Sequence, residues 1–350
     1  METDILIVGG GLAGLRLADM LHSRGQAFHL VEARNRFGGR VAGEAVGGAQ
    51  FDTGPAWFWP GQPRIAALID RFGLRAFEQY TDGLFAYEDA SGAVQHGHGP
   101  AAMAGSWRLE GGLSALVAAL SQAIPARRCS TGDAVVALTR QGDGIEATLA
   151  QGGTIRAGRV VLTLPPRVAA GIACAPALPA DTVAAMRGVP TWMAGQAKAV
   201  AVYETPFWRE AGLSGDAMSR RGPLVEIHDA SPAQGGPYAL FGFVGVPADA
   251  RTDAEALRVA VIAQMGRLFG PRATRPVELL LKDWAADPHT ATAEDRAPMY
   301  AHPVYGLPPA LNGLWDDTLI FGGTEVAPEF GGYIEGAFAA AEEVAARLTV

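Results

Sequence analysis

Hydrophobic and polar positions along the chain follow strand and helix patterns from the first residues onward. An apolar run at 5–8 predicts a buried strand, and apolar residues then recur at helical spacing over 12–21. A second apolar run at 28–31 predicts another strand, so the first three elements form a unit of roughly 30 residues. The chain therefore opens with the pattern of a Rossmann-like α/β fold.

The same patterns predict further elements downstream. Helices are expected over 64–72, 107–123 and 253–269, and a last helix opens at 331–337 and ends at Leu348. Strands are expected at 134–139, 144–150, 154–157, 159–164, 196–203, 238–243, 277–281 and 319–321. Residues 74–105 show neither pattern, and we expect an irregular segment there.

A glycine turn separates the first strand from the first helix. Gly9 allows the tight turn, Gly11 lets a pyrophosphate approach the backbone, and Gly14 lets the helix pack on the strand. The helix N-terminus can then hold the anion. Glu32 ends the second strand, about where an acidic side chain accepts hydrogen bonds from an adenosine ribose. These residues predict a dinucleotide site.

Composition is that of a compact enzyme. The chain has 350 residues, 49% hydrophobic and 18% charged, which is enough for two domains. The net charge of −8 is spread along the sequence, so nucleic acid is not an expected partner. Cys129 and Cys174 lack metal-ligand spacing and allow at most one disulfide, so we expect no metal site and a reduced compartment. Without an export signal or an apolar stretch long enough to span a bilayer, the sequence predicts a cytoplasmic protein and no membrane partner.

A second basic, glycine-bearing segment at 34–40 directly follows Glu32. An extended FAD pyrophosphate needs such a segment, and a simple nicotinamide fold does not. The run 32–40 closely resembles the flavin amine oxidase family, which includes monoamine oxidases, polyamine oxidases and L-amino acid oxidases. Two later runs resemble monoamine oxidase: 196–208, which places Lys198 in an apolar strand, and 322–337, almost residue for residue.

The resemblance implies a fold class and domain boundaries. It implies an α/β protein with a discontinuous, GR2-type, FAD-binding Rossmann-like domain and a reduced α+β substrate domain with a mixed sheet. The first domain would take residues 1–73, 106–172 and 295–350, and the second 74–105 and 173–294. FAD would be noncovalent, because no cysteine lies near Ala293, where monoamine oxidases attach it.

The resemblance also implies a reaction and site residues. An amine would be oxidised to an imine by hydride transfer to flavin N5, and oxygen would reoxidise the flavin and release hydrogen peroxide. Lys198 would assist at N5, Tyr333 would form one wall of an aromatic cage, and Trp57 and Phe243 would line the substrate cavity. The implied cofactor-binding residues are Gly9, Gly11, Leu12, Ala13, Gly14, Glu32, Ala33, Arg34, Gly38, Gly39, Arg40, Gly54, Pro55, Ala56, Val135, Trp284, Gly323, Glu325, Gly332, Tyr333 and Ile334.

Several alternatives stay open. The second cage wall falls on Glu294 when counted from Trp284 without gaps, or on Met299 or Tyr300 if a few residues are inserted. Lys198 could instead point to solvent from a strand edge. The same fold hosts flavoenzymes that dehydrogenate carbon–carbon bonds or oxidise dihydronicotinamides, as renalase-like chains do. A module completed by a partner protein is a further possibility, and the sequence leaves the substrate and the oligomeric state undetermined.

Overall fold

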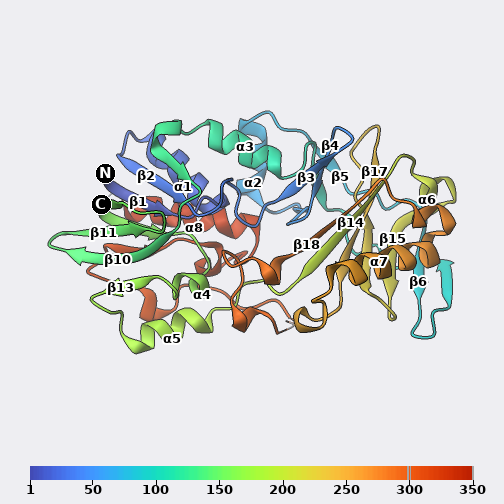
Figure 1. Cartoon of the computed structure of the whole chain (residues 1–350). Helices are drawn as coiled ribbons and strands as arrows, with labels where there is room; N and C mark the ends of the chain where they lie inside the picture. The colour runs from blue at the N-terminus through green and yellow to red at the C-terminus, as the bar shows by residue number, and fades with distance from the viewer. Residues whose placement is uncertain (298, 300, 349–350) are drawn as a thin grey trace.

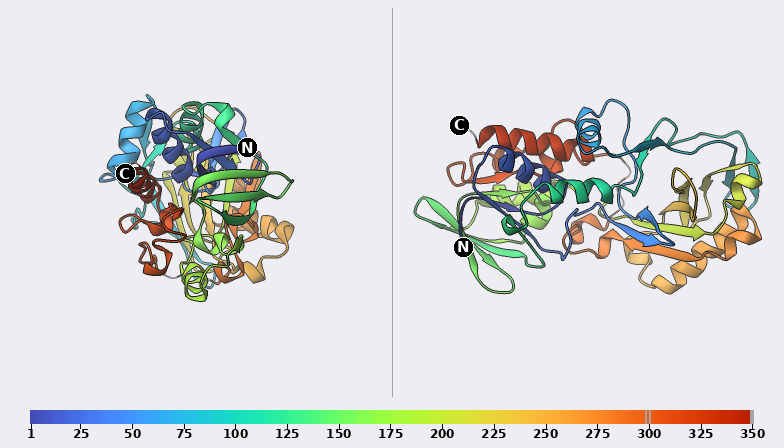
Figure 2. Two further views of the ribbon diagram at one scale, coloured as in Figure 1. Left: turned by 90° about the vertical axis from the view of Figure 1, so that its left-hand side faces the viewer. Right: turned by 90° about the horizontal axis from the view of Figure 1, so that it is seen from above.

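The computed structural model of the chain describes residues 1–297, 299 and 301–348. The molecule is elongated, with one large sheet toward each end, and both termini lie at the same end (Figures 1 and 2). Both sheets draw on segments that are far apart in the sequence. The fold is α/β, and its second large sheet is mixed, as the sequence predicted; the first sheet is mixed as well.

The first sheet has the order β13-β10-β11-β12-β1-β2-β9, with β19 also paired to β12. Strands β1, β2, β9, β12 and β19 form its parallel part. The strands span β1 (Glu2–Val8), β2 (Phe28–Glu32), β9 (Cys129–Thr131), β10 (Val135–Gln141), β11 (Gly144–Leu149), β12 (Thr154–Leu162), β13 (Ala173–Ala175) and β19 (Leu319–Phe321).

β12 is one long strand where the sequence predicted two. Its first half pairs antiparallel with β11, and its last three residues pair parallel with β19. The apolar pattern breaks near Gly158 because the strand changes its neighbour there. The β10–β11 hairpin is thereby joined to the parallel strands.

Helices cover both faces of the first sheet. One face carries α1 (Leu12–Ser23), α2 (Pro63–Arg71), α3 (Ser114–Gln122) and α8 (Ile334–Arg347), which share an apolar core. The short helices α4 (Pro166–Ala169) and α5 (Ala180–Gly188) lie on the other side (Figure 1).

The predicted helix over 107–123 was wrong at its beginning. Trp107–Leu109 forms β8, which pairs with β5 (Ala76–Glu78). Gly111 and Gly112 then adopt φ angles of 77° and 68°. These left-handed conformations end the strand and delay the helix to Ser114.

The second sheet has the order β18-β14-β17-β16-β15-β6-β7. It is mixed, because β6 and β15 run parallel and the other neighbours antiparallel. α7 (Ala254–Phe269) covers one face. The strands span β6 (Leu84–Glu88), β7 (Val94–Gly97), β14 (Ala197–Tyr203), β15 (Leu213–Ser219), β16 (Leu224–Asp229), β17 (Tyr238–Val244) and β18 (Glu278–Asp283), and a hairpin of β3 (Gly43–Val46) and β4 (Ala49–Asp52) and the short helix α6 (Phe207–Glu210) lie outside it.

Two expectations about segment boundaries are corrected. Residues 74–105 are not simply irregular, because they supply β5, β6 and β7. These strands have three to five residues, too short for alternation to stand out. The segment after residue 172 stays with the first sheet, since β13 pairs with β10 and Met186 of α5 joins the same core.

The alternating directions of the side chains along β14 bring Lys198 to the side of the sheet away from α7. Alternate alanines of this strand pack in the core that α7 shares. Val200 and Val202 pack instead against Trp57 and Phe241. Because successive side chains of a strand point to opposite faces, Lys198 shares the face of Val200.

Candidate active site

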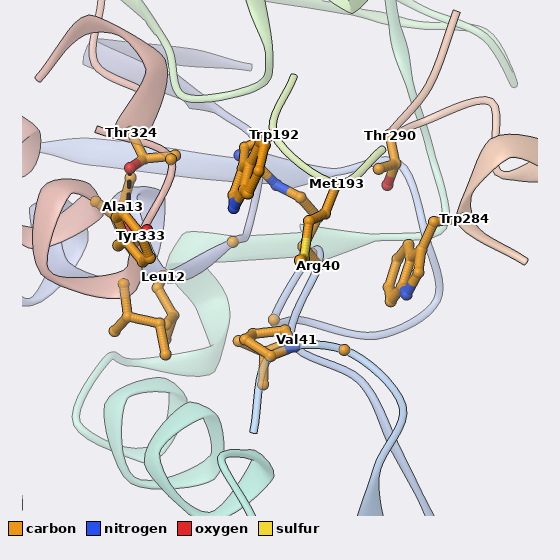
Figure 3. A pocket seen from close by; sticks show the side chains of 18 of the residues that line it. Leu12, Ala13, Arg40, Val41, Trp192, Met193, Trp284, Thr290, Thr324 and Tyr333 are labelled. Atoms are coloured by element: carbon orange, nitrogen blue, oxygen red, sulfur yellow. Dashed lines mark hydrogen bonds between the residues drawn. The ribbon is translucent and has the colours of Figure 1, made fainter. Parts of the chain in front are cut away.

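A cavity of about 420 Å³ brings together most of the predicted site residues (Figure 3). It lies at the carboxyl ends of β1, β2 and β12 and reaches β14 and β17 of the second sheet. The predicted residues that line it are Gly9, Gly11, Leu12, Ala13, Glu32, Arg34, Gly38, Gly39, Arg40, Gly54, Pro55, Ala56, Trp57, Lys198, Phe243, Trp284, Gly332, Tyr333 and Ile334.

Two glycine segments face each other at the first sheet. Gly9 turns with φ 109°, and a Cβ on Gly14 would lie 1.9 Å from the Gly9 carbonyl oxygen. A Cβ on Gly39 would lie 3.2 Å from the Cα of Gly11. Both segments line the cavity with bare backbone, which suits a pyrophosphate.

Two helices begin at this cavity. The first residues of α1 and the residues around Tyr333 and Ile334 of α8 line it. In the described part of the chain, no side chain caps either N-terminus through a hydrogen bond. Their first N–H groups are thus available to an anionic or electron-rich ligand.

Glu32 fastens the nucleotide turn. Its Oε2 accepts a hydrogen bond from the Gly10 N–H (2.7 Å), and its Oε1 accepts one from the Arg34 N–H (2.8 Å). The Arg34 guanidinium donates to Asp287 (2.6 Å) and Thr290 (2.8 Å). Burial opposes ionisation of Asp287, but Arg34 and a nearby lysine hold its pKa below the ordinary value. Arg34 thereby joins the first sheet to the segment after β18.

Arg40 is paired with a fully buried carboxylate. Its Nη1 donates to Glu325 Oε1 at 2.5 Å. The second oxygen, Oε2, is buried and has no hydrogen-bond partner among the described residues. A buried acceptor without a donor costs roughly 1–3 kcal/mol. The cavity with its bare glycines and open helix ends fits an extended dinucleotide, whereas the unmatched Glu325 oxygen lies behind Arg40 and outside the lining.

Lys198 is buried on the cavity wall. Its Nζ donates to the Gly54 carbonyl at 2.6 Å, and lies 5.5 Å and 5.8 Å from the ring centres of Phe243 and Phe241. Burial lowers the pKa of Lys198 to about 8, and the negative charge of Asp52 partly opposes that shift. The side chain therefore does not point to solvent.

Asp52 is the charged neighbour of this lysine. Its oxygens accept from the Leu113 N–H at 3.1 and 3.2 Å, at the start of α3. Burial raises the pKa of Asp52 to about 6, although Arg108, the Leu113 hydrogen bond and Lys198 each act to lower it. Asp52 and Lys198 are thus two buried groups of opposite charge, and burial moves the pKa of each toward neutrality.

Trp57 forms a fixed aromatic wall. Its indole N–H donates to Gln79 Oε1 at 2.8 Å, and its ring meets Phe241 edge to face at 5.1 Å. His228 also meets Trp57 edge to face, at 5.5 Å. Burial would lower the pKa of His228, but hydrogen bonds to two carboxylates raise it.

Tyr333 stands at the start of α8. Its carbonyl accepts a hydrogen bond from Thr324 Oγ1 at 2.8 Å (Figure 3). Its ring stacks on His302 with centres 4.8 Å apart and planes within 12° of parallel. Trp59 meets it edge to face at 6.5 Å. An aromatic group therefore does line the cavity at this position.

The prediction for the second cage wall on Glu294 was wrong. Glu294 is exposed in a short 3-10 turn, Ala293–Asp295, and does not line the cavity. Its neighbours Thr292 and Asp295 form a capping box that fixes this turn. Of the two other candidates, Met299 does not line the cavity and Tyr300 lies outside the described residues.

Some predicted cofactor residues lie behind the cavity surface. Glu325 reaches it through Arg40, and Gly14 serves the packing of α1 on the turn. Val135 is buried in the core of the first sheet, and its backbone contact to adenine stays a prediction. The predicted residues outside the lining are Gly14, Ala33, Val135, Gly323 and Glu325.

Sequence reasoning missed other lining residues. Thr163, Leu164 and Pro165 follow β12 at the carboxyl edge of the parallel strands. Ligands of open α/β sheets bind at this edge, so the sequence could have indicated these residues. Most of the others come from loops without a distinct pattern, whereas Thr324 begins a 3-10 turn and Ala337 lies in the first turn of α8. The others are Val41, Trp59, Gln62, Met103, Trp192, Met193, His289, Thr290, Thr324 and Ala337.

The fold and the cavity define a dinucleotide-binding protein of the Rossmann-like class. Comparison with family models agrees. The model of the NAD(P)-binding Rossmann-like domain matches residues 7–72, and that of flavin containing amine oxidoreductase matches residues 86–349. The chain belongs to the flavin containing amine oxidoreductase family and is an FAD-dependent oxidoreductase.

Individual relatives are similar to this chain over different lengths. A Mycobacterium tuberculosis protein named as a flavin-containing monoamine oxidase, AofH, is 25% identical, with 99% of this chain and 96% of the relative covered. That alignment spans 452 positions, so the relative contains segments that this 350-residue chain lacks. Putrescine oxidase of Kocuria rosea is 38% identical over 25% of this chain and 18% of its own.

Solved structures show the same fold. Putrescine oxidase bound to putrescine superposes with a TM-score of 0.84 at 21% identity, covering 100% of this chain and 99% of the other. Cyclohexylamine oxidase from Brevibacterium oxydans superposes with a TM-score of 0.82 at 20% identity, covering both chains fully. Of the helices within the described ranges, none combines the length and apolar character needed to span a bilayer.

Proposed function

We propose that this protein oxidises an amine that carries an α-hydrogen, with noncovalently bound FAD and with molecular oxygen as the electron acceptor. The observation that carries the proposal is one cavity that joins the dinucleotide features at Gly11 and Glu32 to Lys198 and Tyr333. FAD, when bound, takes two electrons and a proton equivalent from the substrate. Relatives named as monoamine and putrescine oxidases support an amine as that substrate.

The residues of the chain supply position and electrostatics. The glycine segments and Glu32 would hold the dinucleotide, and Glu325 would hold Arg40 at the cavity wall. Tyr333, Trp57 and Phe243 would orient the apolar body of the substrate, and Lys198 would place a charged donor at the edge of the cavity near the reacting atoms. We assign no side chain as an essential proton-transfer base.

Both cysteines lie away from the cavity, which supports noncovalent attachment. Cys129 belongs to β9 and Cys174 to β13, and neither lines the cavity. Burial raises the pKa of Cys129 to about 11 and also raises that of Cys174, so both stay protonated thiols at neutral pH. Acid precipitation of the yellow protein should therefore release FAD into the supernatant, and flavin retained in the pellet would refute this part of the proposal.

The experiment that tests the reaction is an anaerobic screen of amines for loss of flavin absorbance. We expect bleaching by at least one amine with an α-hydrogen and none by a matched amine without it, such as benzylamine against cumylamine. Admission of oxygen should restore the colour and release hydrogen peroxide. Bleaching by a dihydronicotinamide but by no amine would contradict the proposal.

A further inference from the structure

Trp192 lines the same cavity as Tyr333 and packs next to Gly332, the residue before Tyr333. It belongs to the loop ahead of β14 and lines the cavity together with Met193 (Figure 3). A Cβ on Gly332 would lie 3.1 Å from the Cβ of Trp192, and Gly332 has φ +81°. A glycine at this position therefore lets the loop pack against the start of α8. Trp192 and Tyr333 therefore belong to the same part of the cavity wall.

The backbone of this loop is fixed by its surroundings. The Trp192 N–H donates to the Tyr305 hydroxyl at 2.9 Å, and that hydroxyl donates to the Pro190 carbonyl at 2.8 Å. The Thr191 N–H donates to the buried carboxylate of Asp295 at 3.2 Å. A ring held in place before a ligand arrives loses little conformational entropy on binding.

The local conformation directs two consecutive side chains into the cavity. Met193 has φ +60°, a left-handed conformation that non-glycine residues adopt uncommonly. Successive side chains of an extended segment point to opposite sides. The turn at Met193 lets both Trp192 and Met193 face the cavity. Strained conformations of this kind gather at ligand sites, because the surrounding structure must enforce them.

His302 connects the two aromatic rings. It meets Trp192 edge to face at 4.9 Å and stacks on Tyr333 at 4.8 Å. At that spacing the His302 and Tyr333 rings are in direct contact, which leaves no room for a ligand between them. His302 therefore supports the two rings from behind, and the lining surfaces belong to Trp192 and Tyr333.

The charge of the lining limits what those rings can select. Glu32 is the only carboxylate among the described residues of the lining, and it belongs to the dinucleotide turn. Near Trp192 and Tyr333 the lining includes Trp59 and Met193 instead. A second ammonium group on a substrate would thus find no counter-charge there, whereas an apolar ring would be well packed.

We infer that Trp192 is a specificity-determining wall of the substrate site, which selects amines with a ring-bearing body over equally charged and branched amines without a ring. Tyr305 is the positioning residue that holds it. This inference rests on the proposed function only in assuming that the substrate is an amine. The contribution of Trp192 to binding can be tested with ligands that are not oxidised.

The test measures dissociation constants of cumylamine and tert-butylamine from the perturbed flavin spectrum of the holoenzyme. Neither amine has an α-hydrogen, and only the first has a ring. Trp192→Ala should weaken cumylamine by roughly two- to twelvefold, the range of an aromatic pair, and change tert-butylamine by less than about twofold. Trp192→Phe should keep most of the preference. FAD content and thermal unfolding serve as controls for folding.

A double-mutant cycle tests the positioning role. Tyr305→Phe keeps the ring but removes the hydroxyl that binds Pro190 and Trp192. It should weaken cumylamine in the parent and have no further effect in Trp192→Ala, because the two residues act as one unit. A purely structural hydroxyl would give the same loss in both backgrounds, which would overturn the positioning role.

The remaining outcomes separate the inference from the proposed function. Equal loss of both amines, loss of FAD with unchanged ligand preference, or failure of every aromatic probe to bind would overturn the wall. Cumyl alcohol, the uncharged analogue, provides the distinction. If it binds in a Trp192-dependent way while no amine binds or reduces the flavin, the wall is supported and the amine proposal fails.

Discussion

The two ends of the cavity are built by different means. At the first sheet the lining is mainly backbone, from the turn at Gly9 to Gly11, the turn at Gly38 and Gly39, and the starts of two helices. At the second sheet it is side chains, such as Trp57 and Trp192, which arrive from separate strands and loops. The first end would bind its ligand through the conformation of the backbone, and the second through the packing surfaces of several side chains.

This difference explains what each end tolerates. A backbone site depends on the absence of side chains at a few positions, so a single added methyl group can destroy it. A side-chain site distributes its binding over several rings, so one substitution changes preference and leaves the site in place. The following variants test that contrast, from the largest expected effect to the smallest.

Gly14→Ala should have the largest effect. The new Cβ would lie 1.9 Å from the Gly9 carbonyl, and both groups are backbone-bound, so helix α1 must move. Overpacking of this kind costs about 1–3 kcal/mol or more, measured as a fall in the free energy of unfolding. Gly11→Ala is the matched control, because its Cβ would make only ordinary contacts, with the Gly39 Cα at 3.9 Å and the Gly38 carbonyl oxygen at 4.0 Å. It should leave the apoprotein stable while FAD is lost. Equal stability of the two variants would contradict the assigned packing role.

Glu32→Ala should weaken FAD binding next. It removes the acceptor for Gly10 and Arg34 as well as the proposed ribose contact. Hydrogen bonds to a charged group contribute about 1.5–3 kcal/mol, so the dissociation constant of FAD should rise roughly 10- to 150-fold. Titration of apoprotein with FAD measures this, and Glu32→Gln should fall in between. Unchanged affinity would show that Glu32 does not face the cofactor.

Lys198→Met should keep FAD bound and slow the oxidative half-reaction by about tenfold or more, the effect of losing a charged hydrogen-bond donor. Burial lowers the pKa of Lys198 to about 8, so the ammonium is charged below that pH and neutral above it. In the parent, reoxidation should slow as pH rises through about 8, and in the variant the profile should be flat over this interval. Stopped-flow traces that coincide for the two proteins would leave Lys198 with only its hydrogen bond to Gly54.

Tyr333→Ala should give the smallest of the expected losses. Attraction between a protonated amine and a tyrosine ring is worth roughly 0.5 to 2 kcal/mol, so kcat/KM for the best amine should fall by about two- to thirtyfold with FAD content near normal. Tyr333→Phe should be mild. Glu294→Ala is the matched control from the discarded alignment, and its exposed side chain predicts no change. A loss in Glu294→Ala as large as in Tyr333→Ala would contradict the position of Glu294 outside the cavity lining.

The same contrast accounts for what the sequence could predict. The turn from Gly9 to Gly14 and its flanking elements are local, so spacing alone places them in the cavity, with Gly14 behind its surface. Lys198 was recognisable because a charged residue interrupts an apolar strand. The structure confirms that it is buried in the cavity wall, although its role in reaction with oxygen stays a prediction.

The parts that failed depend on tertiary structure. Trp192 has no local signal, because its direction comes from the left-handed backbone at Met193 and a hydroxyl more than 100 residues away. Glu294 was misplaced because counting positions cannot reveal the capped turn that carries it outward. Fold class, the nucleotide turn and the lining by Trp57, Phe243 and Tyr333 thus followed from sequence, whereas Trp192 and the outward position of Glu294 required coordinates.

The Arg40–Glu325 pair has a consequence for how the protein is made. The arginine comes from the first tenth or so of the chain and the glutamate from its last thirty residues, and β19 enters the sheet that β1 begins. A nascent chain still on the ribosome has the glycine turn but lacks Glu325 and β19. We therefore expect cofactor loading to be a late step in biogenesis, and truncated products from interrupted translation should be colourless.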